Sequence, residues 1–276
     1  MKKLKTPLRY PGGKSKAVPQ LFRYFPPLML YDEYREPFLG GGSMAIAVTK
    51  QHPNINVWVN DLYWPLYNFW IQLRDNGDLL ADNILDLRIR NDTPDLIRII
   101  FDSFKIEMND PDTSDFMKAV MFWVLNKCSF SGLTESGSFS ESSSNTNFSI
   151  QNIKKLKHYS KLIKNWTITN RSYCELIKND PSRGKTFIYL DPPYEISSNL
   201  YGNKGNMHKE FDHDEFADNC NRFDIDMAIS YNSDQSVKDR FPDWEQIEFD
   251  LTYSMRSVGE YMEKQKKRKE LLLVNY

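Results

Sequence analysis

The chain has 276 residues, and its 36 Lys and Arg nearly balance its 37 Asp and Glu, which leaves a formal net charge of -1. A chain of this length can bury a substantial core, as one large domain or as one domain that carries a smaller inserted one. The balanced charge excludes an overall basic protein, so a surface that binds a polyanion would have to arise from local sorting of charge.

Cysteine and hydropathy patterns narrow the class further. The three cysteines, Cys128, Cys174 and Cys220, are far apart and have no metal-ligand spacing, which predicts reduced thiols, a cytoplasmic location and no metal site. No run of about 18 apolar residues occurs, so we expect neither a signal peptide nor a membrane span.

Residues 1–62 contain short apolar runs separated by Gly and Pro residues, which is typical of strands joined by functional loops. The first turn, PGGKS at 11–15, looks similar to a phosphate-binding loop, but that motif requires glycine at position 8, where this chain has Leu8. The turn instead presents the ring of Tyr10 and the cation of Lys14. These suit a ligand with a ring and a carboxylate, or else they belong to a solvated turn.

A glycine-rich turn follows in REPFLGGGSMAIA, residues 35–47. Gly40, Gly42 and Ala45 have the G-x-G-x-x-A spacing of nucleotide-binding turns, in which glycines let the backbone approach a ligand at a helix N-terminus. Asp61 lies 21 residues after Gly40, at the end of the strand-like run NVWVND, where a second strand can deliver a carboxylate to ribose hydroxyls. We predict a site for a nucleoside-type ligand; the alternative is a plain strand-to-helix turn with Asp61 as a helix cap.

The middle of the chain changes from acidic to basic. Residues 64–128 have a mostly helical pattern. Residues 71–115 contain 11 acidic and 5 basic side chains, whereas residues 116–171 contain 8 Lys or Arg and 2 Glu. The serine-rich stretch 129–149 is expected to be a loop or a short hairpin, and KKLKHYSKLIKNW, residues 154–166, a basic helix end.

The segment FIYLDPPY, residues 187–194, ends an apolar run on an acid, two prolines and an aromatic ring. A strand that stops at Asp191 places its carboxylate at the C-terminal edge of a sheet, where open α/β sheets bind ligands. Pro192 and Pro193 hold the following turn rigid, while the Pro192 carbonyl remains an acceptor. Two adjacent acceptors can receive both hydrogens of an exocyclic amine, and Tyr194 offers a face for an extruded base. The alternative is a Pro-Pro turn with Asp191 as a cap.

Strand-like runs return from residue 186 onwards, as TFIYL, DMAIS and ELLLVNY. Strands, a helical stretch and strands again predict an α/β domain interrupted by a second one. We place the first domain at residues 1–63 and 165–276 and the inserted one at 64–164. His158 is expected on a solvated basic helix, and His208 and His213 in a loop after DPPY that closes over the substrate.

Six segments together resemble one known family. LRYPGGKSK, EPFLGGGS, VNDL, FIYLDPPY, AISYNSD and KELLLVNY, in this order, are similar to the Dam-type AdoMet-dependent DNA adenine-N6 methyltransferases. The resemblance covers about residues 8–62 and 165–276. It implies a class I methyltransferase (Rossmann-like) fold, a mixed sheet flanked by helices, in which the insert recognises the target sequence.

The resemblance also implies the chemistry and the partners. AdoMet would donate a methyl group to N6 of an adenine flipped out of double-stranded DNA, without a metal. We expect a monomer, with a cognate restriction endonuclease as a further candidate partner.

Site residues carry over from the family's motifs. Those expected to bind AdoMet are Tyr10, Lys14, Phe38, Gly40, Gly42, Asp61 and Asp191. Those expected to act in catalysis are Asp191, Pro192 and Tyr194. The segments SFSGL at 129–133 and GSF at 137–139 resemble the family's F-N-G-L segment and G-x-F turn. The expected DNA contacts are Lys127, Ser129, Ser131, Asn145, Lys154, Lys155 and Lys157.

The DNA-reading hairpin departs from the family pattern. Members that modify GATC carry an arginine there, and this chain has none between residues 128 and 153. Glu135 and Glu141 can accept from cytosine N4, but they cannot bind guanine O6 and N7. We therefore expect a short or degenerate adenine-containing site other than GATC.

Two other functional classes compete with a methyltransferase. An NAD-dependent oxidoreductase could use the G-x-G-x-x-A turn, although it leaves DPPY and the basic segment unexplained. A DNA-binding module without catalytic activity would not need the intact DPPY, glycine turn and Asp61. Methylation of cytosine N4 is disfavoured, because enzymes of that group carry Ser where this chain has Asp191.

Overall fold

A computed structural model describes residues 5–10, 12–134, 137–178, 180–194, 211–249 and 270–276. Its centre is a seven-stranded sheet of order β3-β2-β1-β4-β5-β7-β6, in which β7 runs antiparallel to β5 and β6 and the remaining pairs are parallel. The strands are β1 (Glu33–Glu36), β2 (Asn56–Asn60), β3 (Thr167–Thr169), β4 (Thr186–Leu190), β5 (Asp226–Asn232), β6 (Glu245–Phe249) and β7 (Glu270–Val274).

The central strands are buried on both faces, which explains their unbroken apolar sequences. Every residue of β4 and β7 is buried. Phe187 and Tyr189 of β4 point into one hydrophobic cluster, while Ile188 and Leu190 point into another. This alternation is the period-two pattern of a strand packed on both sides. The mixed sheet with helices on both faces confirms the predicted fold class.

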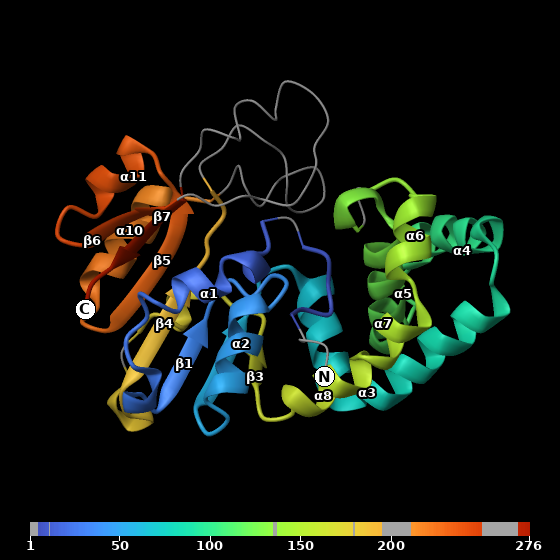
Figure 1. The fold of residues 1–276 in the computed structure, drawn as a ribbon, viewed down its shortest axis with the longest axis horizontal. Coiled ribbons are helices and arrows are strands. Elements are labelled where there is room, and N and C mark those ends of the chain that lie inside the picture. Colours follow the sequence, from blue (N-terminus) through green and yellow to red (C-terminus); the bar gives the residue numbers. More distant parts are fainter. Residues whose placement is uncertain (1–4, 11, 135–136, 179, 195–210, 250–269) are drawn as a thin grey trace.

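Short helices cover the two faces of the sheet (Figure 1). Residues of α1 and α2 belong to the cluster that contains Phe187, and residues of α10 and α11 belong to the cluster that contains Ile188. Asp212 begins α10 by accepting from the backbone N–H groups of Asp214 and Glu215, as an N-cap does. These helices are α1 (Val18–Leu21), α2 (Ser43–Gln51), α10 (His213–Arg222) and α11 (Gln235–Arg240).

Six of the described helices lie between β2 and β3 in the chain and form the part of the molecule at the right of Figure 1. Serine or threonine side chains cap the starts of four of them, at Thr93, Ser114, Ser140 and Ser149. The helices are α3 (Trp64–Arg90), α4 (Pro94–Glu107), α5 (Asp115–Cys128), α6 (Glu141–Asn147), α7 (Ile150–Lys154) and α8 (Leu156–Leu162). The helical pattern of residues 64–128 is confirmed, whereas the domain boundaries stay a prediction.

The serine-rich stretch differs from the expected loop or hairpin. It contains a 3-10 turn, η3 (Phe130–Gly132), one isolated bridge between Ser129 and Phe139, and the helix α6. Helix α6 forms although serine is a weak helix former, because Ser140 caps its first turn and Ser143 and Ser144 are buried.

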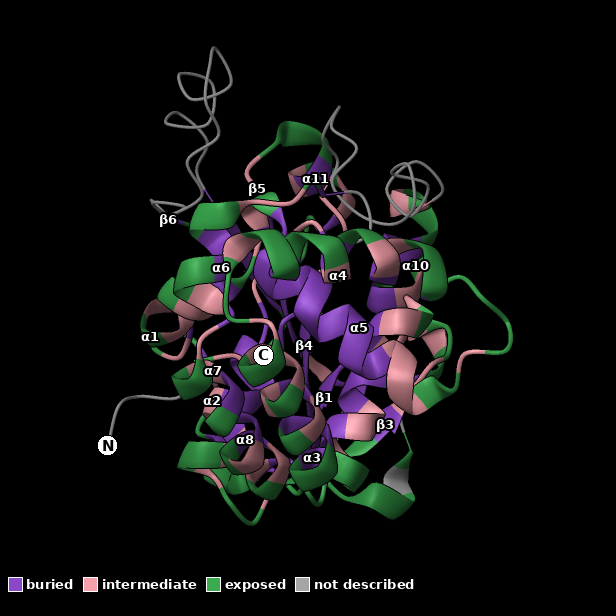
Figure 2. Ribbon diagram, turned by 90° about the vertical axis from the view of Figure 1, so that its right-hand side faces the viewer, coloured by how far each residue is buried: buried purple, intermediate pink, exposed green. Residues whose placement is uncertain are grey.

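The segment before β1 packs on the helical part rather than on the sheet alone. Asn126, on α5, accepts from the Arg9 N–H at 2.9 Å and donates to the Arg9 carbonyl at 2.7 Å. Trp123 donates to the Pro7 carbonyl at 3.2 Å. Residues 119–128 of α5 are all buried, and Figure 2 shows this helix in the interior. The N-terminal segment is therefore held by the same helix that leads into SFSGL.

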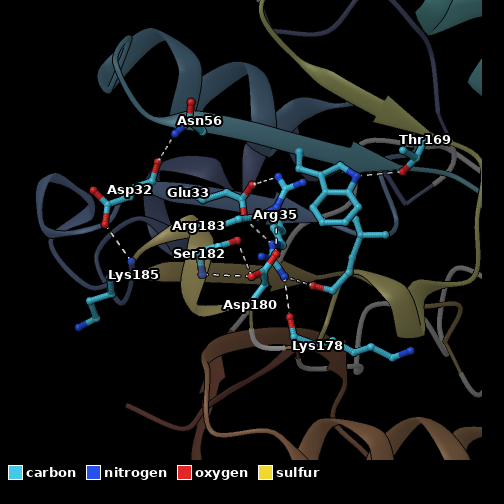
Figure 3. A network of polar contacts seen from close by, with 12 residues as sticks. Asp32, Glu33, Arg35, Asn56, Thr169, Lys178, Asp180, Ser182, Arg183 and Lys185 are labelled. Carbon is cyan, nitrogen blue, oxygen red and sulfur yellow. Dashed lines mark hydrogen bonds and ion pairs between the residues drawn. The ribbon is translucent and has the colours of Figure 1, made fainter.

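An ion-pair network around the buried Glu33 joins β1 to the connection before β4 (Figure 3). Glu33 binds Arg35 at 2.6 Å and Arg183 at 2.8 Å. Arg35 also donates to the carbonyls of Leu176 and Lys178. Both guanidinium groups lie within 5.0 Å of the centre of the indole ring of Trp58.

Among the described helices, none has both the length and the apolar character needed to cross a membrane.

Candidate active site

The glycine turn after β1 has a backbone that only glycine adopts readily. Gly40 and Gly42 have φ of 49° and 68°. A Cβ on Gly40 would lie 3.0 Å from the ring of Tyr10, and one on Gly42 would lie 2.8 Å from the ring of Trp70. Trp70 also donates to the Gly40 carbonyl at 3.1 Å. Tyr10 and Trp70 therefore hold the turn from two sides, and the role of Trp70 has no signal in its sequence neighbourhood.

Asp61 and the glycine turn form one unit, as the spacing of the two motifs predicted. Asp61 accepts from the backbone N–H of Gly40 at 2.8 Å and from that of Tyr63 at 3.0 Å. Burial raises the pKa of Asp61 to about 6, while these two hydrogen bonds oppose the rise. Each carboxylate oxygen has a further lone pair, so hydroxyl groups of a ligand can still bind there.

Lys14 brings the N-terminal turn to the DPPY segment. It begins the 3-10 turn η1 (Lys14–Lys16), and only 4% of its side chain is exposed. Its Nζ lies 3.0 Å from the Asp191 carboxylate and donates to the Tyr194 hydroxyl. The solvated-turn alternative for this lysine is therefore wrong.

Asp191 follows β4 at the C-terminal edge of the sheet, where the sequence predicted it. Its side chain is 23% exposed, so a substrate can reach the carboxylate. Burial raises the pKa of Asp191 to about 6; Lys14 opposes that rise and the charge of Glu270 adds to it. The site thus holds a carboxylate whose charge depends on a buried cation.

Glu270 is a site residue that the sequence motifs did not reveal. It is the first residue of β7, it is buried, and it accepts from the Tyr194 hydroxyl at 2.6 Å. The Nζ of Lys14 lies 3.8 Å from the same carboxylate oxygen. Glu270 lies in KELLLVNY, one of the segments that resemble the family, but no role was assigned to it, and the apolar run LLLV itself indicates only a strand.

An aromatic cluster flanks the site beyond the glycine turn. Phe38 is half-buried and stacks on Tyr173 with ring centres 5.5 Å apart, and Phe211 lies 5.8 Å from Phe38. His213 contacts the Tyr231 hydroxyl and is the first residue of α10, so its expected place in a loop is wrong. The position of His213 is fixed because Asp212 caps the helix that begins at this residue. His208 lies outside the described residues.

The residues expected to contact DNA are spread over buried and exposed positions. Lys127 and Ser129 are buried, at 6% and 0% exposure. Ser129 accepts from the Thr134 N–H, and burial together with the charges of Arg9 and Lys155 lowers the pKa of Lys127 to about 7. These two residues are thus buried at the end of α5 and at the start of the SFSGL segment, and their contact with DNA stays a prediction.

The other five predicted contacts lie nearer the surface. Ser131 is partly exposed and has a φ of 53°, and Asn145 and Lys154 are exposed. Lys155 donates to the Asn152 side chain at 2.7 Å, and Lys157 forms an ion pair with Asp82 at 2.6 Å. Their DNA contacts also stay predictions. His158 is exposed on α8, as expected.

Comparison with known proteins agrees with this geometry. The profile of the D12 class N6 adenine-specific DNA methyltransferases matches residues 10–268, which is most of the chain. A curated relative, the Type II methyltransferase M.MjaIII of Methanocaldococcus jannaschii, is 25% identical over 201 residues, which cover 68% of each chain. The glycine turn, Asp61 and Asp191 lie within the matched region and converge at one edge of the sheet. This chain therefore belongs to the D12 class of N6 adenine-specific DNA methyltransferases.

Proposed function

We propose that this enzyme moves a methyl group from AdoMet to N6 of an adenine that has been extruded from duplex DNA onto Tyr194. The observation that carries this proposal is the convergence of Asp191, Lys14 and Tyr194 beside the glycine turn. It supplies a hydrogen-bond acceptor, a cation and an aromatic ring at the C-terminal ends of β1 and β4. An oxidoreductase that used the glycine turn would require none of these three features.

The residues around the glycine turn fit AdoMet. Gly40 and Gly42 allow the positive φ of a nucleotide-binding turn, and the rings of Tyr10 and Trp70 pack where their side chains would lie. Asp61 provides acceptors for ribose hydroxyls, and Phe38 provides a half-buried ring. Asn232, at the end of β5, is buried and its side-chain oxygen accepts from no described residue, so it can receive a donor of the ligand. AdoMet would supply the electrophilic methyl group.

Asp191 and the Pro192 carbonyl act on the substrate amine. Two acceptors would bind its two hydrogens and favour a pyramidal nitrogen, whose lone pair is no longer conjugated with the ring. The Asp191 carboxylate also stabilises the positive charge that develops on N6. Most of the rate then comes from positioning and electrostatics rather than from a covalent intermediate.

The sequence that this enzyme reads is proposed to differ from GATC. The SFSGL segment and the exposed Asn145 lie beside a stretch without arginine, the residue that most often reads guanine. The Type II relative supports a further proposal, that a restriction endonuclease of the same specificity accompanies this enzyme. We also propose that it acts on DNA as a monomer.

The test measures methyl transfer from labelled AdoMet to DNA that lacks adenine methylation. Asp191→Ala should lower kcat at least tenfold, because the variant lacks the acceptor that holds the amine, while DNA binding persists. AdoMet affinity should change less than kcat. Asp239→Ala, on α11, is the matched control and should keep the wild-type rate. An Asp191→Ala variant that retains more than a tenth of the activity would contradict the role given to this carboxylate.

A further inference from the structure

The hydroxyl end of Tyr194 is anchored by a strand from the far end of the chain. Tyr194 donates to Glu270 at 2.6 Å across 76 residues of sequence. Glu270 is 4% exposed and lies on β7, which pairs with β5 in the interior of the sheet. A hydrogen bond to a buried carboxylate is stronger than one between neutral groups, so this contact restricts the ring.

One side of the Tyr194 ring is already taken. Tyr231, on β5, stacks against it with ring centres 5.8 Å apart and planes inclined by 21°. A substrate base that stacks on this ring would use the side opposite Tyr231. The position of the ring then decides where the amine of that base lies relative to Asp191.

We propose that Glu270 is a positioning residue for methyl transfer, which fixes the position of the Tyr194 ring by holding its hydroxyl, while Tyr231 stacks against one face of the ring; this inference rests on the proposed stacking of the base on Tyr194. The main chain at Pro192 and Pro193 fixes one end of the tyrosine, since proline restricts φ. Glu270 fixes the other end. Lys14 joins the two carboxylates of the site, because its Nζ lies 3.0 Å from Asp191 and 3.8 Å from Glu270.

The kinetic test compares Glu270→Leu with Glu270→Gln, using unmethylated plasmid DNA and labelled AdoMet. Removal of a hydrogen bond to a charged group corresponds to about a 10- to 100-fold decrease in kcat for Glu270→Leu. Glu270→Gln keeps an acceptor and should recover most of that decrease. Kinetics are measured at about pH 8, where Asp191 is ionised with or without the charge of Glu270. In a Tyr194→Phe background, Glu270→Leu should then change kcat by less than about threefold, since the hydroxyl through which it acts is gone. The KM for AdoMet should stay near the wild-type value in both Glu270 variants.

A second readout does not depend on activity. The protein is labelled with 3-fluorotyrosine, and the fluorine resonance of Tyr194 is identified by its disappearance in Tyr194→Phe. Glu270→Leu should shift this resonance, whereas Glu248→Gln should leave it in place, because Glu248 lies on β6 and pairs with Lys238.

Three outcomes would overturn the inference: an unmoved Tyr194 resonance, a wild-type kcat in Glu270→Leu, or an equal decrease of kcat in the wild-type and Tyr194→Phe backgrounds. A wild-type protein that transfers no methyl group would instead contradict the proposed function. The resonance would still decide whether Glu270 holds the ring.

Discussion

Lys14 lies within 3.0 Å of Asp191 and 3.8 Å of Glu270, so a single buried cation faces two carboxylates. Burial favours the protonated form of Asp191, and the ammonium group opposes that effect. In the described part of the chain, the charged or titratable groups that interact with Asp191 are Lys14, Glu270, Tyr194, Glu36, Tyr189 and Tyr34. The charge on Asp191 therefore depends on neighbours from several elements of the fold.

The first prediction concerns pH. The pKa of Asp191 is raised from 3.8 to about 6, so the carboxylate is present above about pH 6 and is protonated as the pH falls. We expect kcat/KM to fall below about pH 6, because the protonated acid cannot stabilise the developing positive charge. Lys14→Met should move this limb to higher pH, since it removes the cation that lowers the pKa.

The measurement is the pH dependence of kcat/KM for DNA, taken at DNA concentrations well below KM and at saturating AdoMet. Lys16→Met, an exposed lysine of the same 3-10 turn, is the matched control and should leave the profile unchanged. The prediction fails if kcat/KM falls only near the pKa of an ordinary aspartate, or if Lys14→Met does not change the pH at which it falls. Either result would show that another group controls the rate.

The ion-pair network of Glu33, Arg35 and Arg183 connects β1 to the segment that leads into β4. Arg35 is 1% exposed and depends on Glu33 for its charge partner. The two strands that this network joins carry the glycine turn and Asp191 at their C-terminal ends. Their relative position therefore depends on contacts at the other end of the same strands.

The second prediction is that Glu33→Ala destabilises the protein strongly. Removal of one partner of a buried ion pair leaves an uncompensated charge and costs about 3–5 kcal/mol. Glu175→Ala is the control, because Glu175 pairs with Arg171 at the surface and such a pair contributes less than about 1 kcal/mol. Urea unfolding followed by tryptophan fluorescence measures both. Equal midpoints for the two variants would refute the structural importance of the network.

Most of the elements around the site could be predicted from the sequence. TFIYL and ELLLVNY form β4 and β7, because apolar runs of this length suit strands buried on both faces, and NVWVND forms β2, in which Val57 and Val59 are buried. Asp61 and Asp191 could be placed at one edge, because parallel strands present their C-terminal ends together. Helix α6 could not, since its stability comes from a cap and from tertiary burial rather than from helix propensity.

The site residues that the sequence did not predict share a physical cause. Trp70 and Glu270 contact the site across 30 and 76 residues of sequence. Such contacts are set by the packing of strands and helices, and no local pattern in the chain marks them. Lys127 shows the reverse case, because the basic stretch predicted a DNA contact for this lysine but gave no sign that it is buried.

Because the net charge of the molecule is close to zero, DNA must be attracted by a local cluster of basic side chains. Lys154 is exposed, and Lys155 is close enough to Lys127 to lower the pKa of that lysine, as Arg9 also does. These basic groups come from α5, the α7–α8 region and the N-terminal segment. Arg9 donates to the Ser129 carbonyl at the start of the SFSGL segment, where the resemblance to the family predicts DNA.

The third prediction is that Lys154→Gln combined with Lys155→Gln weakens binding to all DNA sequences alike. Removal of each phosphate contact should reduce the slope of log affinity against log salt by up to about 0.9. Lys50→Gln with Lys185→Gln is the control, because Lys185 precedes β4 at the edge of the sheet opposite Asp191. Fluorescence anisotropy over a range of salt concentrations measures the slopes. An unchanged slope would show that neither lysine contacts a DNA phosphate.

The most direct test maps modified bases in plasmid DNA from a host without adenine methylation after exposure to the purified protein and AdoMet. Single-molecule sequencing distinguishes N6-methyladenine from N4-methylcytosine and identifies the sequence around each. We predict N6-methyladenine at one short or degenerate site other than GATC, and none with Asp191→Ala. Modification of cytosine would contradict the proposed reaction. N6-methyladenine that persists in Asp191→Ala would contradict the role of the Asp191 carboxylate.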